Sequence, residues 1–338
     1  MRSYKCLQVN VFSEGVYCIV PIRDEDRYDI LHWRNSQIDI LRQQAPLTKE
    51  QQDIYFKTTI TQLFEQEQPK QILWSFLENN QLIGYGGLVH IDWQNKSAEI
   101  SFLTETSRNN SKEQFILDWT NYLILIKRLG KSLNFNSIFT YAYDIRPNLY
   151  IALEISGFKE TKRLKDFIEI NSELRDVVIH TFYFNLNFRF AEPKDAELYF
   201  KWANDKLVRQ NSFNTSEIMY QQHIDWFSHK LNSKDCFFYL FLNEENVPVG
   251  QVRIDKSSEE IVIGISIDEN YRGKGLGTQM LNQACDNYLL KFPKAEIIAY
   301  IKEENTASIH QFSKAGFIQI ENVVINECNS YRFKKAIK

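Results

Sequence analysis

An internal repeat is the feature that most constrains how this chain can fold. CIVPIRDEDRYDILHWRN (18–35) and NFRFAEPKDAELYFKWAND (187–205) each read as a strand, a polar corner and a helix. Later segments correspond in the same order, IGYGGLVHID (83–92) to VGQVRID (249–255) and ISGFKE (155–160) to KAGFIQ (314–319). Two long copies in a fixed order indicate a duplicated domain rather than a solenoid of many short repeats.

The length of 338 residues also favours two domains. The repeat places them at residues 1–185 and 186–338, with the boundary around FYFNLNF. A hydrophobic content of 43%, a charged content of 25% and a net charge of −3 are typical of globular proteins and argue against nucleic-acid binding. No apolar run is long enough to predict a membrane span. Five scattered cysteines without a CxxC pair predict reduced thiols in the cytoplasm and no metal site.

A glycine-rich stretch in the second half has the context of an anion-binding turn. The isoleucine-rich segment EEIVIGISID (259–268) predicts a strand, YRGKGLGTQML (271–281) follows it, and apolar residues then recur at helical spacing. A strand, a glycine turn and a helix N-terminus together can hold phosphates. The stretch is neither a Walker loop nor a GxGxxG dinucleotide fingerprint, and the chain lacks the HRD and DFG motifs of protein kinases.

The remaining pattern, R-x-x-G-x-G at Arg272, Gly275 and Gly277, resembles the pyrophosphate motif of the GNAT superfamily of N-acetyltransferases. A second signature of that family, an Asn after the next strand and Gly-Phe after the next helix, is matched by Asn305 and Gly316-Phe317. The resemblance implies an α/β (α+β) fold of two tandem GNAT-like domains. Each would be a mixed, mostly antiparallel sheet flanked by helices, with a splayed strand pair.

Acetyl-coenzyme A is the co-substrate that this resemblance implies. The family pattern places the thioester and pantetheine along one strand edge and the pyrophosphate on the glycine turn, with the next helix alongside. The residues expected to contact the coenzyme are Ile265, Ser266, Ile267, Arg272, Gly273, Lys274, Gly275, Leu276, Gly277, Thr278, Asn305, Ser308 and Phe312.

The segments VRQNSFNTSEI (208–218) and QQHIDWFSHKL (221–231) resemble one GNAT branch in particular. That branch acetylates nucleotide-linked 4-amino-4,6-dideoxy sugars in surface-glycan biosynthesis. The resemblance implies an amino-sugar acceptor that contacts Arg209, Asn211, Asn214 and Gln251. Two alternatives stay open: a GNAT enzyme acting on protein N-termini or another amine, and a non-catalytic coenzyme A-binding protein.

The acid–base residues depart from the family pattern. The position of the family's glutamate, ten residues before the motif arginine, is Val262, and the usual tyrosine of the later helix is Phe312. His223 is therefore the predicted general base, because imidazole titrates near neutrality. Proton loss to water relayed by Glu259 or backbone carbonyls is the alternative.

The first half keeps the order of segments and has lost the phosphate motif. After AEISFL (98–103) the chain reads TETSRNNSKEQF, which contains no glycine, and Arg146 stands where the second half has Asn305. We expect a degenerate GNAT-like domain without ordinary coenzyme A binding. A structural role is the simplest expectation, and the polar stretch HWRNSQIDILRQQ leaves open a site for a sugar or a partner.

Overall fold

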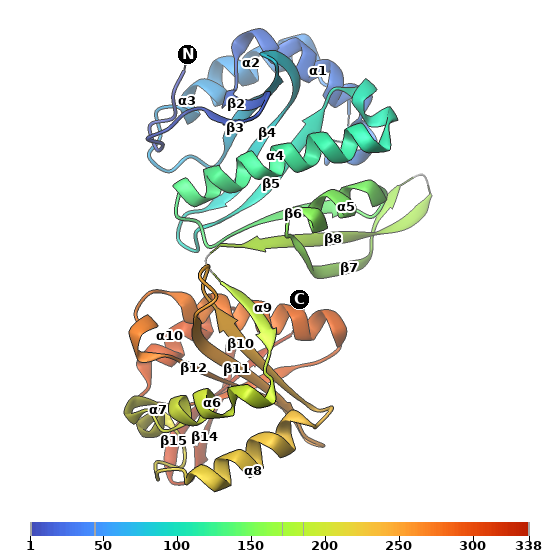
Figure 1. Cartoon of the computed structure of the whole chain (residues 1–338). Coiled ribbons are helices and arrows are strands. Elements are labelled where there is room, and N and C mark those ends of the chain that lie inside the picture. The colour runs from blue at the N-terminus through green and yellow to red at the C-terminus, as the bar shows by residue number, and fades with distance from the viewer. Residues whose placement is uncertain (1, 44, 171, 185, 337–338) are drawn as a thin grey trace. The chain divides into compact units, whose positions relative to one another are not determined.

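The computed structural model describes residues 2–43, 45–170, 172–184 and 186–336. The chain divides into two compact units, residues 1–184 and residues 185–338, and each unit has its own sheet (Figure 1). Across the described residues, no helix is long and apolar enough to cross a membrane.

The first unit contains an eight-stranded sheet in the order β1-β2-β3-β4-β5-β6-β8-β7. All neighbouring strands are antiparallel except β5 and β6, which are parallel. The strands are β1 (Phe12–Glu14), β2 (Tyr17–Pro21), β3 (Ile72–Glu78), β4 (Gln81–Asp92), β5 (Ser97–Thr104), β6 (Ser137–Tyr143), β7 (Lys159–Ile170) and β8 (Glu173–Tyr183).

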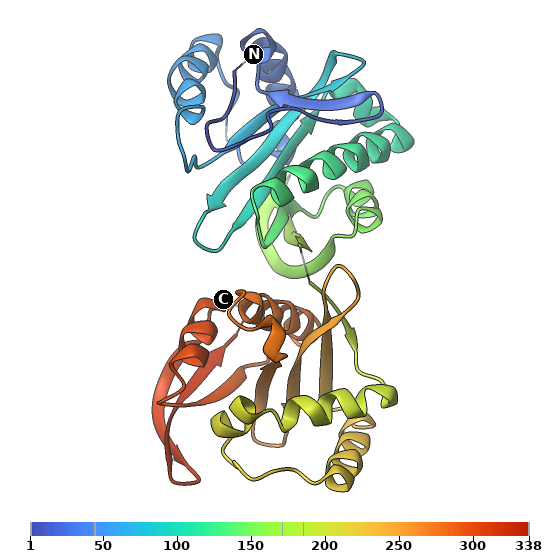
Figure 2. The same ribbon diagram turned by 60° about the vertical axis from the view of Figure 1, so that its left-hand side comes forward.

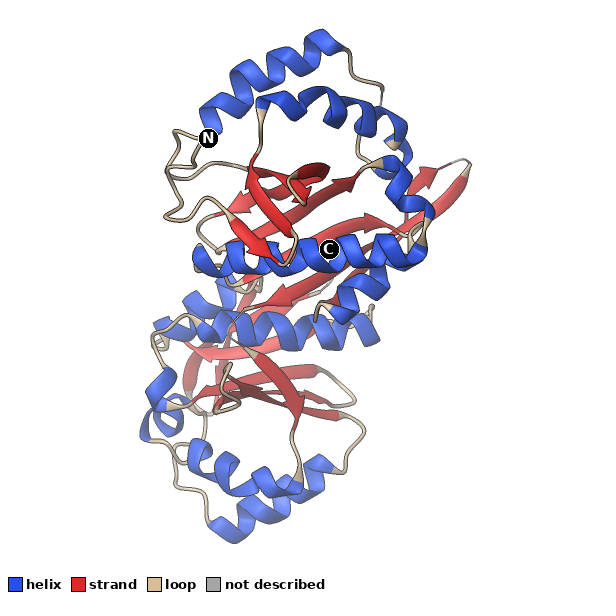
Figure 3. Ribbon diagram, turned by 45° about the horizontal axis from the view of Figure 1, so that its top comes forward, coloured by secondary structure: helices blue, strands red, loops and turns tan. Residues whose placement is uncertain are grey.

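Helices flank this sheet (Figure 3) and share one apolar core with it. The longest, α4, buries a stripe that includes Trp119, Tyr122 and Ile126, because apolar residues three and four apart lie on one helical face. The helices are α1 (Arg27–Ser36), α2 (Lys49–Tyr55), α3 (Thr61–Leu63), α4 (Lys112–Ser132) and α5 (Pro147–Ile155), with 3₁₀ turns η1 (Asp24–Asp26), η2 (Ile38–Ile40) and η4 (Thr106–Asn110) and a π-helical turn η3 (Phe56–Ile60).

The second unit repeats this plan with a seven-stranded sheet in the order β14-β15-β13-β12-β11-β10-β9. Again one pair, β12 and β13, is parallel and the other pairs are antiparallel. The strands are β9 (Asn187–Phe190), β10 (Cys236–Leu242), β11 (Pro248–Lys256), β12 (Ile261–Ile267), β13 (Ile297–Lys302), β14 (Ile318–Ile325) and β15 (Cys328–Lys335).

Two apolar clusters lie on the two faces of the second sheet, because successive strand residues point to opposite faces. α9 and α10 contribute to one cluster, while α6 and α8, which pack against one another (Figure 2), contribute to the other. The helices are α6 (Ala196–Ala203), α7 (Lys206–Asn211), α8 (Tyr220–Leu231), α9 (Leu276–Lys291) and α10 (Thr306–Lys314), with 3₁₀ turns η5 (Pro193–Asp195) and η6 (Glu269–Tyr271). The predicted fold class, two mixed and mostly antiparallel sheets flanked by helices, is confirmed.

Candidate functional site

Two parallel strands diverge in the centre of the second sheet. β12 pairs with β13 only at Ile261 and Val262, although both strands continue well beyond that point. On its other side β12 stays paired with β11 as far as Ile267. The edge of β12 from Ile263 to Ile267 is therefore not paired with β13, and Ile265, Ser266 and Ile267 lie along it. A chain-like ligand can add its hydrogen bonds to such an edge.

The glycine turn lies directly beyond this edge. Gly273 and Gly275 both have φ of 74°, a left-handed conformation that side chains other than glycine rarely adopt. A Cβ atom at either residue would meet no atom within 4 Å, so the turn is open on that side. Gly275 is the N-cap residue of α9 and provides no side-chain cap, which leaves the first amides of the helix free of an intrahelical acceptor. The turn thus combines accessible backbone N–H groups with the positive end of a sixteen-residue helix.

The motif arginine holds the turn in place through protein contacts. The Nε of Arg272 donates to the carbonyl of Ile267 at 3.0 Å, and its Nη2 donates to Oδ1 of Asp205 at 2.6 Å. Asp205 is also the N-cap of α7, where it accepts from the amide of Val208. Arg272 therefore ties the end of β12 to the start of α7.

α10 borders the turn from the other side. Asn305 caps this helix by accepting from the amide of Ser308 at 3.2 Å, as a good N-cap residue does. Phe312 is 4% exposed and packs edge-on against Phe317. The two helices approach closely, because a Cβ atom at Gly277 would lie 2.3 Å from the side chain of Gln311. The helix that follows Asn305 thus packs against the first turn of α9.

The predicted acceptor-binding residues of α7 and the following loop form hydrogen bonds within their own segment. Arg209 donates to the carbonyls of Asn214 and Ser216 and to the hydroxyl of Ser212, and Asn211 donates to the carbonyl of Leu207. Burial lowers the pKa of Arg209. These contacts shape the segment, and they leave the Nε of Arg209 buried without a partner in the described structure.

α7 lies across the ends of the two diverging strands. Its first residues are tied to the end of β12 through the ion pair of Asp205 with Arg272. Its last residues are tied to the end of β13, where Nζ of the 5% exposed Lys302 donates to the carbonyl of Gln210 at 2.9 Å. No sequence signal pointed to Lys302 or Asp205. The two contacts bring the predicted acceptor segment beside the predicted coenzyme edge.

Gln251 lies on β11, opposite Ser266 of β12. Its Nε2 donates to the Ser266 hydroxyl at 3.3 Å, and its Oε1 is buried without a hydrogen-bond partner in the part of the chain described. A buried carbonyl oxygen without a donor is costly. Two residues along, the guanidinium of Arg253 lies over the ring of Trp226 from α8. This face of β11 offers unused polar groups next to an aromatic ring.

His223 packs against the inner side of this aromatic ring, with its ring centroid 5.7 Å from that of Trp226. It is 2% exposed between α6 and α8, its Nε2 lies 3.1 Å from the carbonyl of Ala196, and its ring stacks on Phe227. Burial lowers its pKa, which favours the neutral imidazole. A general base must come within hydrogen-bond reach of the proton that it removes. His223, the predicted base, is therefore buried in the core, because it lies on the same inward face of α8 as Phe227.

Comparisons with known proteins agree with the duplicated plan. Residues 19–179 and residues 185–318 match two family models, each described as an acetyltransferase (GNAT) domain. The chain belongs to the GNAT acetyltransferases. It carries two GNAT domains in tandem, which mark an acetyl-CoA-dependent N-acetyltransferase, and acetyl-CoA is the donor typical of the family.

Solved structures that resemble the chain each correspond to one domain in length. A spermidine N-acetyltransferase from Vibrio cholerae, solved with CoA and spermine, is 16% identical with a TM-score of 0.42, over 45% of this chain and 95% of that one. A domain from Methanocaldococcus jannaschii is 20% identical with a TM-score of 0.40, over 45% of this chain and 98% of that one. A search of curated proteins gave no match.

In the first GNAT domain a 3₁₀ turn takes the place of the glycine turn. η4 leads from the end of β5 into α4, whose N-cap is Ser111. Arg108 in this turn donates two hydrogen bonds to the fully buried Asp118 and pairs with Glu78 at 3.1 Å. Its charge is therefore used inside the domain.

Two further positions differ between the GNAT domains. Arg146 is the N-cap residue of α5, as Asn305 is of α10, and its guanidinium lies over the ring of Trp119. Glu99 is the last residue of β5 that pairs with β6, as Val262 is the last of β12 that pairs with β13. The carboxylate missing at Val262 thus has a counterpart in the first GNAT domain. The sequence alone did not indicate this equivalence of Glu99 and Val262. It follows from the register of the parallel strand pairs and not from the distance along the chain to an arginine.

Proposed function

We propose that the second GNAT domain holds acetyl-CoA and transfers its acetyl group to the amino group of a nucleotide-linked amino sugar. The observation that carries the donor half is the glycine turn, where two left-handed glycines leave open space beside the N-terminus of α9. Backbone amides in that arrangement suit a pyrophosphate.

The residues of the unpaired β12 edge, the glycine turn and α10 are of the types that could hold the parts of acetyl-CoA. Amides from Gly273 to Thr278 would hold the pyrophosphate, and the unpaired edge at Ile265–Ile267 would hold the pantetheine arm. Asn305, Ser308 and Phe312 on α10 would flank it. When bound, the coenzyme supplies an acetyl thioester that an amine can attack. Free strand amides on the β12 edge would stabilise negative charge that develops on the carbonyl oxygen.

Polar groups on β11 and α7 support an acceptor that carries hydroxyls. The unpartnered Oε1 of Gln251 can accept from a sugar hydroxyl, which would satisfy a buried carbonyl oxygen. Arg209, Asn211 and Asn214 belong to α7 and the loop after it. Hydrogen bonds at both ends of α7 hold this segment across the strand ends. Arg253 beside Trp226 adds a cation next to an aromatic surface, a combination suited to a nucleotide.

The amine proton needs an acceptor other than His223. Val262 has no ionisable group, and the ring of His223 is hydrogen-bonded to the backbone carbonyl of Ala196. Glu259 is exposed in the turn before β12, at the opposite end of that strand from the glycine turn. We therefore assign the proton to solvent water. A sugar amine, which is less basic than a lysine, suits this route because more of it is already neutral near pH 7.

An amine panel tests the acceptor class. Release of the CoA thiol would be measured with a UDP-linked 4-amino-4,6-dideoxy sugar, with spermidine and with a peptide that has a free N-terminus. We expect kcat/KM to be highest with the sugar nucleotide. Gln251→Ala should lower that value about 2- to 10-fold, because one hydrogen bond is lost, while Gln221→Ala on the exposed side of α8 should not. Higher kcat/KM with spermidine or the peptide would exclude the amino-sugar assignment.

A further inference from the structure

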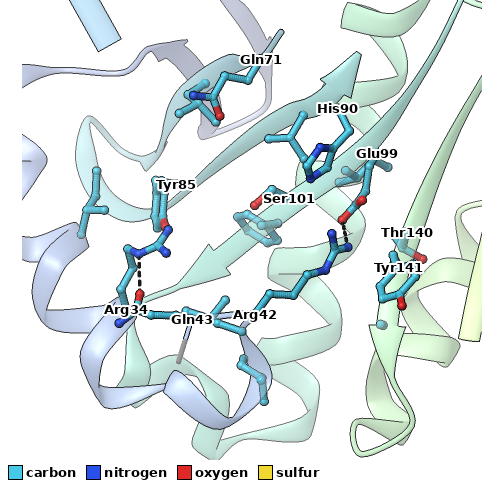
Figure 4. A pocket seen from close by; sticks show the side chains of 18 of the residues that line it. Arg34, Arg42, Gln43, Gln71, Tyr85, His90, Glu99, Ser101, Thr140 and Tyr141 are labelled. Carbon is cyan, nitrogen blue, oxygen red and sulfur yellow. Dashed lines mark hydrogen bonds and ion pairs between the residues drawn. The ribbon is translucent and has the colours of Figure 1, made fainter. Parts of the chain in front are cut away.

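The first GNAT domain, although it lacks the glycine turn, contains a cavity of about 1080 Å³. β5 pairs with β6 only from Ser97 to Glu99, and the cavity opens where the two strands diverge. Residues from α1, the segment after it and strands β4 to β6 line the cavity (Figure 4). A volume of this size accommodates a complete small molecule.

The charges around this cavity are predominantly positive. The cationic side chains that line it are Arg34, Arg42, Lys70 and Arg146, against a single carboxylate, Glu99. Arg42 forms an ion pair with Glu99 (Figure 4) and lies over the ring of Tyr141. Burial raises the pKa of Glu99, and the charge of Arg42 opposes that shift. The carboxylate of Glu99 thus neutralises Arg42, and no carboxylate among the described lining residues is left to neutralise the other cations.

Arg34 has neutral partners only. Its Nε donates to Oε1 of Gln43 at 3.0 Å and its Nη1 donates to the Tyr85 hydroxyl at 2.9 Å, as Figure 4 shows. A guanidinium has five N–H donors in a planar fork, so Arg34 keeps donors for another group. No carboxylate among the described residues forms an ion pair with it.

Arg146 is the second cation without a counter-charge. It forms no hydrogen bond or ion pair within the described structure, and its guanidinium faces the ring of Trp119, 5.8 Å from the centroid. Burial lowers its pKa to about 10. The nearby carboxylate of Asp144 is occupied by Arg163 and by the hydroxyl of Tyr150. A partly buried charge without a partner is unfavourable, and an anion in the cavity would offset that cost.

The remaining walls suit the body of an organic molecule. Rings of Tyr55, Tyr141 and Trp119 line the cavity together with aliphatic side chains. The Thr140 hydroxyl, also in the lining, is buried without a partner in the described part of the chain. Charge, aromatic surface and an unused hydroxyl occur together here.

We propose that the cavity of the first GNAT domain binds a small organic anion, a carboxylate or phosphate ester with an aromatic or apolar body, through Arg34 and Arg146. This binding is independent of acetyl-CoA, because the turn that would hold the pyrophosphate is replaced by η4. It is equally independent of the acceptor assigned to the second domain.

The test uses the full chain and four probes of one shape. Phenyl phosphate and benzoate carry the two kinds of anion, benzamide is neutral, and benzylamine is cationic. Titrations followed by saturation-transfer NMR would give each Kd. We expect at least one anion to bind at least about tenfold more tightly than benzamide and benzylamine, and the stronger of the two anions identifies the head group. Equal affinity for all four probes, or no binding, would overturn the proposal.

Variants locate the site. Arg34→Gln and Arg146→Gln each remove one charge, and we expect about a tenfold loss of anion affinity. Arg175→Gln on β8, a partly exposed arginine outside the lining, should leave the affinity unchanged. Arg34→Lys keeps the charge and should retain binding even where the glutamine variant folds poorly. A loss in either glutamine variant supports the site, and unchanged affinity in both overturns it. Competition by acetyl-CoA in a Gly275→Val chain would overturn the independence from the coenzyme.

Discussion

Single residues at matching positions show how the two domains have diverged. Glu99 and Val262 end the parallel ladders of their sheets, and Arg146 and Asn305 begin the helices that follow. The carboxylate remains in the domain that has no glycine turn. The second domain, with the turn and the asparagine, has an aliphatic side chain in its place.

The glycine turn can be tested by one substitution. Gly275→Val places a Cβ at a φ of 74° beside the amides of α9, so we expect loss of the increase in melting temperature that acetyl-CoA gives to the original chain. Gly316→Val is the matched control, since Gly316 has a φ of 83° and similarly open surroundings. Both variants should lose stability by about 1–2 kcal/mol, but only the first should lose the response. A full response in Gly275→Val would show that the turn does not hold the coenzyme.

The burial of His223 leads to a prediction about stability. Its folded-state pKa lies below the unfolded-state value near 6.5, so the unfolded chain takes up a proton first as the pH falls. The stability that neutral His223 contributes is complete above about pH 6.5 and is lost below it, at no more than about 1.4 kcal/mol per pH unit. His223→Gln should therefore flatten the fall in melting temperature between pH 6.5 and 5, while His229→Gln, exposed on the same helix, should not.

Turnover gives the second measurement on His223→Gln. Because the imidazole is hydrogen-bonded to the carbonyl of Ala196 between α6 and α8, kcat of this variant at pH 7.5 should stay within a few-fold of the original value. A fall of about 10²-fold or more with a lost acidic limb in the pH–rate profile is the behaviour of a general base. That result would restore the catalytic role.

At the scale of elements, the sequence predicted what is local and missed what is distant. β12, the turn and α9 could be predicted because their strand pattern, glycines and helical spacing are contiguous. The position of α7 depends on Asp205 meeting Arg272, 67 residues later, and on Lys302 reaching Gln210 across 92 residues. No periodicity encodes such contacts. The inward face of α8 shows a similar limit, since a histidine on an apolar stripe reads equally as a base or as core.

Asp205 tests whether α7 positions the acceptor. Asp205→Asn keeps a good N-cap for α7 but weakens the ion pair with Arg272, so we expect the acceptor KM to rise several-fold. The Kd of acetyl-CoA should change less than about twofold, because the glycines keep their conformation. Asp205→Ala should in addition lower the free energy of unfolding by about 1 kcal/mol through loss of the cap. A loss of coenzyme affinity equal to the loss for the acceptor would show that the pair supports the glycine turn instead.

At the scale of the whole molecule, the two copies of the domain differ in the chemistry at their diverging strands. Each domain has diverging parallel strands in the middle of its sheet. In one the strands lead to an open turn with free amides. In the other they lead to a cavity lined by arginines, two of which, Arg34 and Arg146, have no carboxylate partner among the described residues. The fold alone therefore does not give a domain its ligand, which depends on the residues at the strand ends.

The stoichiometry of coenzyme binding tests this division of the molecule. Calorimetric titration of the full chain with acetyl-CoA should give one site per chain. The second domain would hold it, since Arg108 in η4 is already paired with Asp118 and no left-handed glycine occurs in that turn. Gly275→Val should remove the binding heat entirely, whereas Arg34→Gln in the first domain should leave both the heat and the single site unchanged. Two sites per chain, or one site that persists in Gly275→Val, would mean that the cavity of the first domain accepts coenzyme A. The arginines there would then serve its phosphates rather than a separate anion, so this measurement also bears on the identity of the ligand in the cavity.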